Sequence, residues 1–317
     1  MQRYIVWRLA LIAPTLLFAC TLVFLVMRIL PGDITFVIFG DVAVNPEVRE
    51  SLRDELGLND PLYVQYGGWL WRMFNGEFGG HSLESDEQIA SIIGRQLPVT
   101  LLLTVYTIFF SMLISIPFGI ISAVSEGRWP DRFIRAITLG GLALPHLWVS
   151  LLLLLGLLLF FEWSPPIIYY SPWVNPWSHI QLMIWPTLIL TWECSSHLVR
   201  VIRSSMIDVL RQPYLVTAQS KGLPVYRVIL WHALPNVMIP SLTMVALQVG
   251  TLIGGALVLE TIFGLPGLGR GLVQAAISRD YPVVQSLAVF LIFLSLILNL
   301  FIDVVYRFID PRISYSV

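Results

Sequence analysis

Six long apolar runs dominate the pattern of hydrophobic and polar positions along this chain. A helix needs roughly 20 predominantly apolar residues to cross about 30 Å of hydrocarbon, and each run is close to that length. The fourth is the weakest, because Pro186, Glu193 and His197 interrupt it. The pattern predicts an all-α polytopic membrane protein with six transmembrane helices. The runs cover residues 9–27, 97–125, 136–161, 180–201, 237–259 and 281–302.

The composition agrees with this class of protein. Hydrophobic residues make up 56% of the 317 positions and charged residues only 12%, whereas soluble domains carry about 25% charged residues. The net charge of −1 gives no reason to expect nucleic acid as a partner. Cys20 and Cys194 both lie inside apolar runs, so the sequence predicts neither a disulfide framework nor redox chemistry.

The first run has features of a secretory signal peptide, since Arg3 and Arg8 precede it. Its 19 uncharged residues, however, exceed the core of about 7 to 15 residues that is usual for such signals. The chain continues as RILPGD, without a small-x-small cleavage site. We therefore expect an uncleaved transmembrane helix.

The positions of Lys and Arg predict the orientation. If the N-terminus is cytoplasmic, twelve of the nineteen basic residues fall in cytoplasmic segments, as the positive-inside rule requires. The C-terminus and the polar segment 203–240 then lie in the cytoplasm as well. The expected division is a first part, 1–96, with one transmembrane helix and a long extracytoplasmic loop, and a five-helix core, 97–317.

The long loop has a pattern of its own. Asn45 is placed as an N-cap before a short amphipathic helix that begins at Pro46 and stops at Gly57. An aromatic stretch at 62–79 has the Trp and Tyr content expected at a membrane interface. Eleven acidic residues lie between Asp33 and Glu87. The loop is interpreted as a solvated cap, as a docking surface for an extracytoplasmic partner, or as both.

Glycine and proline positions inside the runs predict how the helices pack. Gly250 and Gly254 form a small-xxx-small pattern that allows close helix approach. Pro117, Pro145 and Pro186 favour kinked helices around a central pathway.

Catalytic and metal sites are not indicated by the sequence. The five histidines are dispersed and lack metal-ligand spacing. Glu193 and His197 stand four apart on one helical face, which allows three readings: a satisfied structural pair, a gating element or a metal site. The segment GLPGLGRG at 264–271 lacks the Gly-Lys-Ser/Thr ending of a phosphate loop. If the chain moves a solute uphill, the energy must therefore come from another protein.

The polar segment 203–240 is the feature best suited to receive that protein. It contains the only lysine of the chain, Lys221. Two short helices are predicted, at 204–220 and 224–234, with a bend at Gly222.

The spacing in this segment resembles the EAA loop of ABC importer permeases. That loop reads Glu-Ala-Ala, three residues, Gly, nine residues and Ile-x-Leu-Pro. Four positions match it and three differ, since valine, threonine and histidine replace Glu, Ala and Ile. The matching residues are Ala218, Gly222, Leu234 and Pro235, and the differing ones are Val216, Thr217 and His232.

Further segments are similar to the B-type permease of the oligopeptide, dipeptide and nickel subfamily. The similarity covers nearly the whole chain, and only residues 81–94 show no clear family pattern. The segments are LPGD at 30–33, LGLNDPLYVQYGGWL at 56–70, RQLPVTLLL at 95–103, LPHLWVSLLL at 144–153, ETIFGLPGLGRGLVQAAISRDYPVVQ at 260–285 and NLFIDVVYRFIDPRI at 299–313.

This resemblance implies the fold of a type I ABC importer permease in the cell membrane of a prokaryote. It implies a pore shared with a second, C-type permease, two cytoplasmic ATPases that bind ATP and Mg, and an extracytoplasmic solute-binding protein. The chain itself would bind no cofactor and have no ATPase site. Peptides are the implied substrate; nickel chelates, glutathione-like peptides and oligosaccharides remain alternatives.

The resemblance also implies two sites. The 211–227 hairpin would contact an ATPase, with charged contacts from Arg211, Lys221 or Arg227. The coupling residues are Tyr214, Leu215, Val216, Thr217, Ala218, Gln219, Lys221, Gly222 and Leu223. The extracytoplasmic mouth would include Phe263, Pro266, Gly267, Arg279, Asp280 and Tyr281; a simple turn into the sixth run is the alternative for 279–285.

Two other classes of protein fit less well. A stand-alone secondary transporter needs ionisable residues at mid-membrane or inverted repeats, and a membrane enzyme needs a clustered active site. The sequence indicates none of these features.

Overall fold

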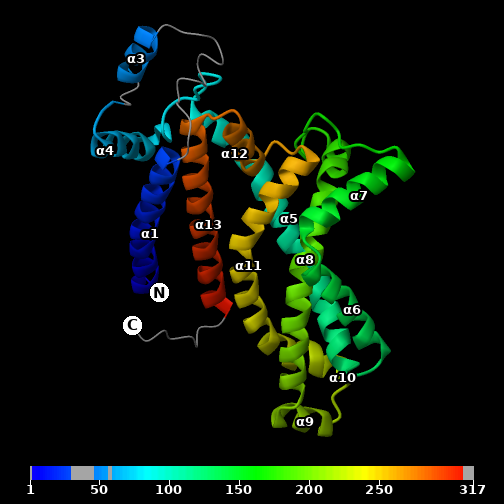
Figure 1. Ribbon diagram of the computed structural model, residues 1–317. Helices are drawn as coiled ribbons and strands as arrows, with labels where there is room; N and C mark the ends of the chain where they lie inside the picture. The colour runs from blue at the N-terminus through cyan, green and yellow to red at the C-terminus, as the bar shows by residue number, and fades with distance from the viewer. Residues whose placement is uncertain (1, 30–45, 56–58, 310–317) are drawn as a thin grey trace. The chain divides into compact units, whose positions relative to one another are not determined.

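The computed structural model describes residues 2–29, 46–55 and 59–309, and the regular elements in these residues are helices (Figure 1). The LPGD segment at 30–33, the Asn45 cap and the Gly57 stop lie outside the described residues. The helices are α1 Gln2–Ile29, α3 Pro46–Glu55, α4 Leu62–Arg72, η1 Met73–Glu77, α5 Ile89–Val124, α6 Trp129–Ala143, α7 His146–Phe161, α8 Pro176–Leu210, α9 Pro213–Ser220, α10 Val225–Arg227, η2 Val228–Ala233, α11 Leu234–Phe263, α12 Leu268–Ile277 and α13 Tyr281–Ile309.

The all-helical membrane class is confirmed. Among the described residues, four helical stretches are long and apolar enough to cross a membrane, and they match the first, second, fifth and sixth runs. The stretches are Ala10–Ile29, Ile89–Val124, Val225–Phe263 and Tyr281–Ile302. The bent pair α6 and α7 would add a fifth. The fourth run forms α8, which is a continuous helix of 35 residues but a more polar one.

The third run is not a single helix, which corrects the sequence-based prediction. α6 and α7 meet at an angle of 101°. Pro145 has no backbone N–H to donate and disfavours helical geometry in the residue before it; Leu144 is accordingly extended, with φ −93° and ψ 120°. α5 and α8 continue past Pro117 and Pro186, so the chain breaks at only one of the three prolines singled out in the sequence.

The polar segment also differs from its prediction. A single helix at 204–220 is wrong, because α8 ends at Leu210 and Pro213 opens the separate helix α9. Proline fits the first turn of a helix, where its missing N–H has no partner to lose. The second predicted helix does begin after Pro224, but the chain remains helical through α10, η2 and α11 as far as Phe263.

The chain forms two compact units that are not contiguous in sequence. The first contains residues up to Thr100 together with Pro266–Ile297, and the second contains Leu101–Leu265 together with the chain from Leu298 onward. In the first unit, α1 packs against α4. Phe24 and Trp69 are buried there, and the hydroxyl groups of Thr21 and Tyr66 share a hydrogen bond of 2.8 Å.

In the second unit, α8 is the central helix and packs most extensively with α11 and α6 (Figure 1). Its start is fixed by Asn175, whose side chain accepts a hydrogen bond from the Ser178 N–H at 3.1 Å, as an N-cap does.

Glycines allow the neighbours of α8 to approach closely. A Cβ on Gly119 of α5 would lie 2.5 Å from Ile202 Cγ2, and one on Gly255 of α11 would lie 3.1 Å from Leu190 Cδ2. Nothing lies within 4 Å of a Cβ built on Gly254. The close contact of α11 therefore involves the glycine one position after the predicted small-xxx-small pair.

Candidate functional site

The hairpin at 211–227 is anchored by one fully buried side chain. Leu215 of α9 has no exposed surface and belongs to a hydrophobic cluster with Met206 of α8, Ala233 of η2 and Val237 of α11. Buried apolar area of this kind holds elements together without a directional bond. Leu215 therefore secures α9 to the two long helices instead of contributing to its outer surface.

The opposite side of α9 is open to a partner. Tyr214 is 46% exposed and Val216 55% exposed, and Thr217 and Lys221 are exposed as well. Ala218 and Leu223 are half-buried against the hydrophobic cluster; the description does not extend to the side chain of Gln219. The predicted coupling residues whose side chains are described thus divide into an outer surface and an inner anchor, a division that the sequence spacing did not reveal.

Gly222 ends α9 in a left-handed conformation with φ +82°. The Leu223 N–H reaches back to the carbonyl of Ala218 at 3.4 Å, and the Lys221 N–H donates to Thr217 O at 3.1 Å. This pattern is that of a Schellman cap, which favours glycine because a Cβ strains the left-handed region. The bend predicted at Gly222 is a helix cap with open space around the glycine Cα.

Polar contacts tie the hairpin to neighbouring elements. Arg211 pairs with Glu126 at 3.2 Å, and Asn236 of α11 donates to the Tyr214 hydroxyl at 3.0 Å. Within the part of the chain that the structure describes, Lys221 and Arg227 form no ion pair. These two basic side chains are therefore the ones free to meet an acidic partner.

A buried ion pair braces the helices from which the hairpin extends. Asp131 of α6 has no exposed surface and accepts hydrogen bonds from Arg203 Nε at 2.7 Å and Nη2 at 2.9 Å. Ser122 of α5 donates to it at 2.6 Å and the Gly127 N–H at 2.9 Å. A two-pronged arginine contact of this kind fixes geometry as well as charge. Asp131 thus connects α5, α6 and α8, a role that the sequence analysis missed.

The residues predicted at the extracytoplasmic mouth are mostly buried. Phe263 is buried at the end of α11, and Gly267, Asp280 and Tyr281 are buried too. Pro266 is half-buried, and Arg279 is exposed with a left-handed φ of +60°. Of this set, Arg279 alone is exposed.

Asp280 anchors the segment for which the sequence showed no family pattern. It accepts a hydrogen bond from Ser82 Oγ at 2.6 Å and a longer one from the Glu84 N–H at 3.4 Å. His81 and Gln88 close the same segment with an isolated antiparallel bridge. Asp280, the residue just before α13, therefore holds the 81–88 loop in place.

The same loop ends in an exposed charge pair. Ser91 Oγ donates to Glu87 at 2.7 Å and Arg95 Nη2 donates at 2.9 Å. These two hydrogen bonds lower the pKa of the Glu87 carboxyl group, and the positive charge of Arg95 acts in the same direction. The pairing is complete at neutral pH and is lost as the pH falls through the lowered pKa.

Replacing Asp280 by asparagine is expected to loosen the 81–88 loop. The amide keeps the size of the carboxyl group but loses its charge, and a buried hydrogen bond to a charged group is worth about 1.5–3 kcal/mol. Limited proteolysis should then cut this loop about tenfold faster than in the unmodified chain. Asp86→Asn is the matched control, because Asp86 is exposed in the same loop; equal cleavage of both variants would contradict the anchoring role.

Glu193 pairs with a different histidine from the one suggested by the sequence. Its Oε2 lies 3.3 Å from Nδ1 of His146, the first residue of α7, and among the described residues it forms no ion pair or hydrogen bond with His197. The break at Pro145 brings His146 to this place. The i,i+4 interpretation of Glu193 and His197 as a satisfied pair is therefore wrong. No group of three or more His, Cys, Asp or Glu residues in the described ranges is arranged to hold a metal ion.

Comparison with known proteins decides the family. Residues 115–315 match the family described as binding-protein-dependent transport system inner membrane component, and residues 1–104 match the N-terminal part of such membrane components. The chain belongs to this permease family.

Relatives of this permease extend over its full length. It is 37% identical over 316 residues, covering 100% of both chains, to a putative peptide transport system permease protein of Brucella abortus. It is 36% identical to the oligopeptide transport system permease protein AppB of Bacillus subtilis, covering 99% of this chain and all of AppB. It is also 36% identical to the glutathione transport system permease protein GsiC of Salmonella typhimurium, covering 100% of both.

A solved structure supports the fold of the permease. The MetNI methionine ABC transporter in an inward-facing conformation matches with a TM-score of 0.58 and 16% identity. The match covers 71% of this chain and 99% of the MetNI chain. At this identity the similarity concerns the fold alone.

Proposed function

We propose that this chain is one of two permease subunits of an ATP-driven importer of peptides, in the cell membrane of a prokaryote. Support for the substrate comes from the full-length relatives, whose names refer to peptide, oligopeptide and glutathione transport. The chain would supply half of the translocation pathway and no ATPase site. Its pore partner would be a homologous, C-type permease.

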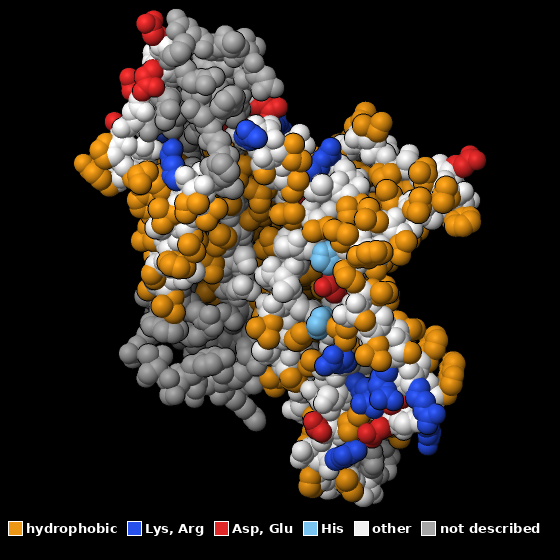
Figure 2. All heavy atoms as spheres, viewed as in Figure 1, with side chains coloured by type: hydrophobic (Ala, Val, Ile, Leu, Met, Phe, Trp, Pro, Cys, Tyr) orange, Lys and Arg blue, Asp and Glu red, His pale blue; other side chains and the backbone are white. Residues whose placement is uncertain are grey.

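The proposed topology places both termini and the 211–227 hairpin in the cytoplasm. The distribution of Lys and Arg along the chain supports it. In Figure 2, basic side chains gather over α6 and the lower part of α8, towards the end that carries α9. The segment 263–281 would then lie on the extracytoplasmic side, where a solute-binding protein delivers its cargo.

The proposal rests on how α9 packs against the long helices of the chain. The outer residues of α9 are exposed, while Leu215 is fully buried against α8 and against η2, which continues into α11. An ATPase that holds the outer surface of α9 would therefore move these two long helices with it. Closure of two ATPases on ATP would be converted into a rearrangement of the pathway, since each nucleotide state would favour one helix arrangement.

A reconstituted complex tests this proposal. The chain would be co-expressed with a C-type permease and two ATPases, placed in liposomes with ATP inside, and supplied with a solute-binding protein outside. We expect uptake of short peptides and faster ATP hydrolysis when peptide-loaded binding protein is outside. Uptake of nickel chelates or oligosaccharides, with none of peptides, would overturn the substrate class; uptake by this chain alone, driven by an ion gradient, would overturn the importer itself.

A further inference from the structure

One face of α8 carries a continuous polar stripe. Glu193, His197, Arg200 and Ser204 follow each other at spacings of four, three and four residues, which places them above one another on an α-helix. Figure 2 shows histidine and acidic side chains next to the basic cluster over α6 and α8. This stripe is also the reason that α8 is not among the strongly apolar helices, although its 35 residues extend about 52 Å.

Other helices cover the remaining sides of α8. On the α6 side, Trp192 Nε1 donates to Ile137 O at 3.2 Å. On the α11 side, Gln248 donates to the Cys194 carbonyl at 3.3 Å. On the α5 side, Ser115 donates to Ser195 O at 3.3 Å. The stripe therefore lies on the side of α8 that these three helices leave open, where α7 contacts it only at its Glu193 end through His146.

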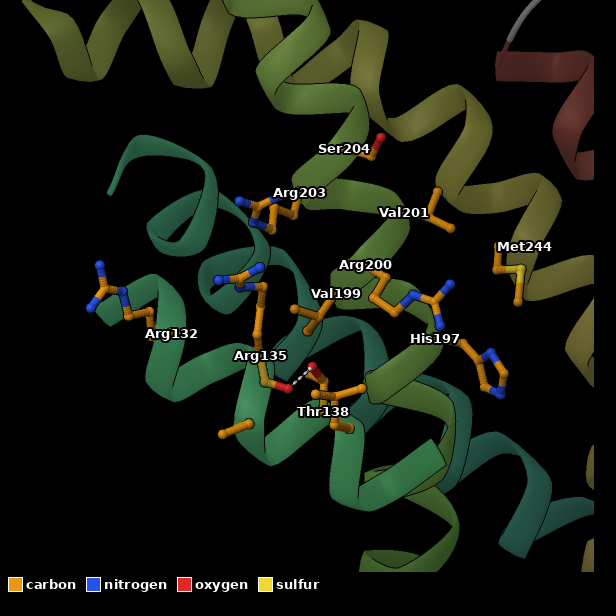
Figure 3. A pocket seen from close by; sticks show the side chains of 12 residues that line it. Arg132, Arg135, Thr138, His197, Val199, Arg200, Val201, Arg203, Ser204 and Met244 are labelled. Carbon is orange, nitrogen blue, oxygen red and sulfur yellow. Dashed lines mark hydrogen bonds between the residues drawn. The ribbon is translucent and has the colours of Figure 1, made fainter. Parts of the chain in front are cut away.

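A groove opens along the part of the stripe formed by His197, Arg200 and Ser204, while Glu193 is not among its lining residues. It has a volume of about 870 Å³ and lies across α8 between α6 and α11. Figure 3 shows Arg200 and His197 projecting from the same side of α8 towards Met244 of α11. The remaining lining residues include Arg132 and Arg135 of α6.

One ionisable side chain of the stripe has a charged partner, and two have none among the described residues. Glu193 is paired with His146, and both side chains are partly open, with 38% and 27% of their surface exposed. Neither His197 nor Arg200 has a hydrogen bond or ion pair to another side chain of the described residues. Ionisable groups are costly in hydrocarbon, so they face water-filled cavities or protein partners in membrane helices. His197 and Arg200 along the groove, together with the partly exposed Glu193 on the same face of α8, indicate an aqueous surface.

The order of charges along the stripe matches a short zwitterion. Glu193 and Arg200 are seven residues apart, about 10 Å along the helix axis. Three residues of an extended peptide span about the same length. The carboxylate of Glu193 is suited to an ammonium group, and the guanidinium of Arg200 is suited to a carboxylate, which it binds in a planar two-pronged geometry.

We propose that Glu193, His197 and Arg200 of α8 line the aqueous translocation path and bind the two charged ends of a short peptide, with Arg200 facing its carboxylate and Glu193 its ammonium group. This inference rests on the proposed function as a peptide importer. Binding at the stripe is transient. Because the stripe binds the charged ends of a peptide, it favours peptides with free termini over peptides with blocked termini.

Thiol accessibility in the assembled complex tests the aqueous surface without any transport. In a background with Cys20→Ala and Cys194→Ala, cysteine would be placed at Glu193, His197 and Arg200. Controls are Ile184→Cys and Leu188→Cys, because these α8 side chains are 39% and 45% exposed but lie among apolar residues. A charged, membrane-impermeant thiol reagent should modify the stripe positions about tenfold faster, since it reacts with the hydrated thiolate. Equal rates at stripe and control positions would overturn the aqueous assignment.

Peptide selectivity tests the charge assignment. Arg200→Gln is expected to slow uptake of a tripeptide with a free carboxylate about tenfold, with little change for its C-terminal amide. For each peptide, the uptake rate of the variant complex is divided by that of the unmodified complex. The preference of the solute-binding protein for one peptide affects both rates equally and does not change this ratio. Arg200→Lys should restore only part of the difference, because lysine keeps the positive charge but not the two-pronged geometry. Arg128→Gln is the control, since Arg128 is an exposed arginine before α6 and not part of the stripe.

The outcomes separate this inference from the proposed function. An equal effect of Arg200→Gln on both peptides, or no effect on either, would overturn the role of Arg200. A complex that moves no peptide at all would contradict the proposed function, while the thiol labelling, which needs no substrate, would still decide whether the stripe faces water.

Discussion

Replacing Asp131 by asparagine is expected to lower the free energy of unfolding by about 3–5 kcal/mol, the cost of breaking a buried ion pair by removing one partner. Asparagine has nearly the shape of aspartate but cannot neutralise Arg203. It also replaces an acceptor that receives hydrogen bonds from Ser122 Oγ and the Gly127 N–H with a group that has one acceptor oxygen in place of two. The guanidinium, only 21% exposed, would then remain without its counter-charge.

Unfolding in detergent with increasing denaturant, followed by tryptophan fluorescence, measures this effect. Glu126→Gln is the matched control, because it removes an ion pair with Arg211 in which the side chains are 49% and 70% exposed. Exposed pairs contribute about 0–1 kcal/mol. The double variant Asp131→Leu with Arg203→Met should recover much of the loss, since it leaves no unpaired charge. If Asp131→Asn lowers the free energy of unfolding no more than Glu126→Gln does, the stabilising role of the Asp131–Arg203 ion pair is contradicted.

Replacing Gly222 by tryptophan is expected to abolish the stimulation of ATP hydrolysis by peptide-loaded binding protein, while the complex remains in the membrane. The glycine has φ +82° and open space around it. A side chain there costs about 1–2 kcal/mol for the left-handed conformation, which is too little to unfold the chain. The indole ring would stand on the exposed surface of the hairpin and keep an ATPase from closing on α9.

Gly127→Trp is the control for this prediction. Gly127 also has a left-handed φ, of +74°, and open space around its Cα, but it lies in the turn between α5 and α6. The control should keep most of its peptide-stimulated hydrolysis. If peptide-loaded binding protein still stimulates ATP hydrolysis fully in the Gly222→Trp variant, the hairpin does not couple the ATPase to the permease.

The sequence predicted the helices whose apolar pattern is strong. α1, α5, α11 and α13 contain the first, second, fifth and sixth runs, because membrane helices must satisfy their backbone hydrogen bonds internally and expose apolar side chains. α8 was harder to predict for a functional reason. The polar stripe at Glu193, His197 and Arg200 weakens the very signal by which a membrane helix is recognised.

Two helix breaks depended on local context that composition does not contain. Pro145 interrupts its run, while Pro117 and Pro186 do not. Proline is tolerated inside a membrane helix where neighbouring groups satisfy the freed carbonyls, and sequence alone does not say where such neighbours stand. Pro213 had the same effect in the polar segment.

The side-chain pairs at the site could not be predicted from sequence at all. Asp131 and Arg203 are 72 residues apart, and Ser82 and Asp280 are 198 apart. The motif spacing located the hairpin correctly as a candidate, yet it could not distinguish the buried Leu215 from the exposed Val216 beside it. That distinction depends on which face of α9 meets α8 and α11.

The interleaved order of the two units has a consequence for biosynthesis. Residues 1–100 share a unit with 266–297, and contacts such as those of Ser82 with Asp280 and of Thr100 with Leu268 need both segments. At about 5–20 residues per second, the ribosome takes roughly ten to thirty seconds to make residues 101–265 in between. Residues 1–100 must therefore remain in the membrane without their packing partners, residues 266–297, until residues 101–265 have been synthesised.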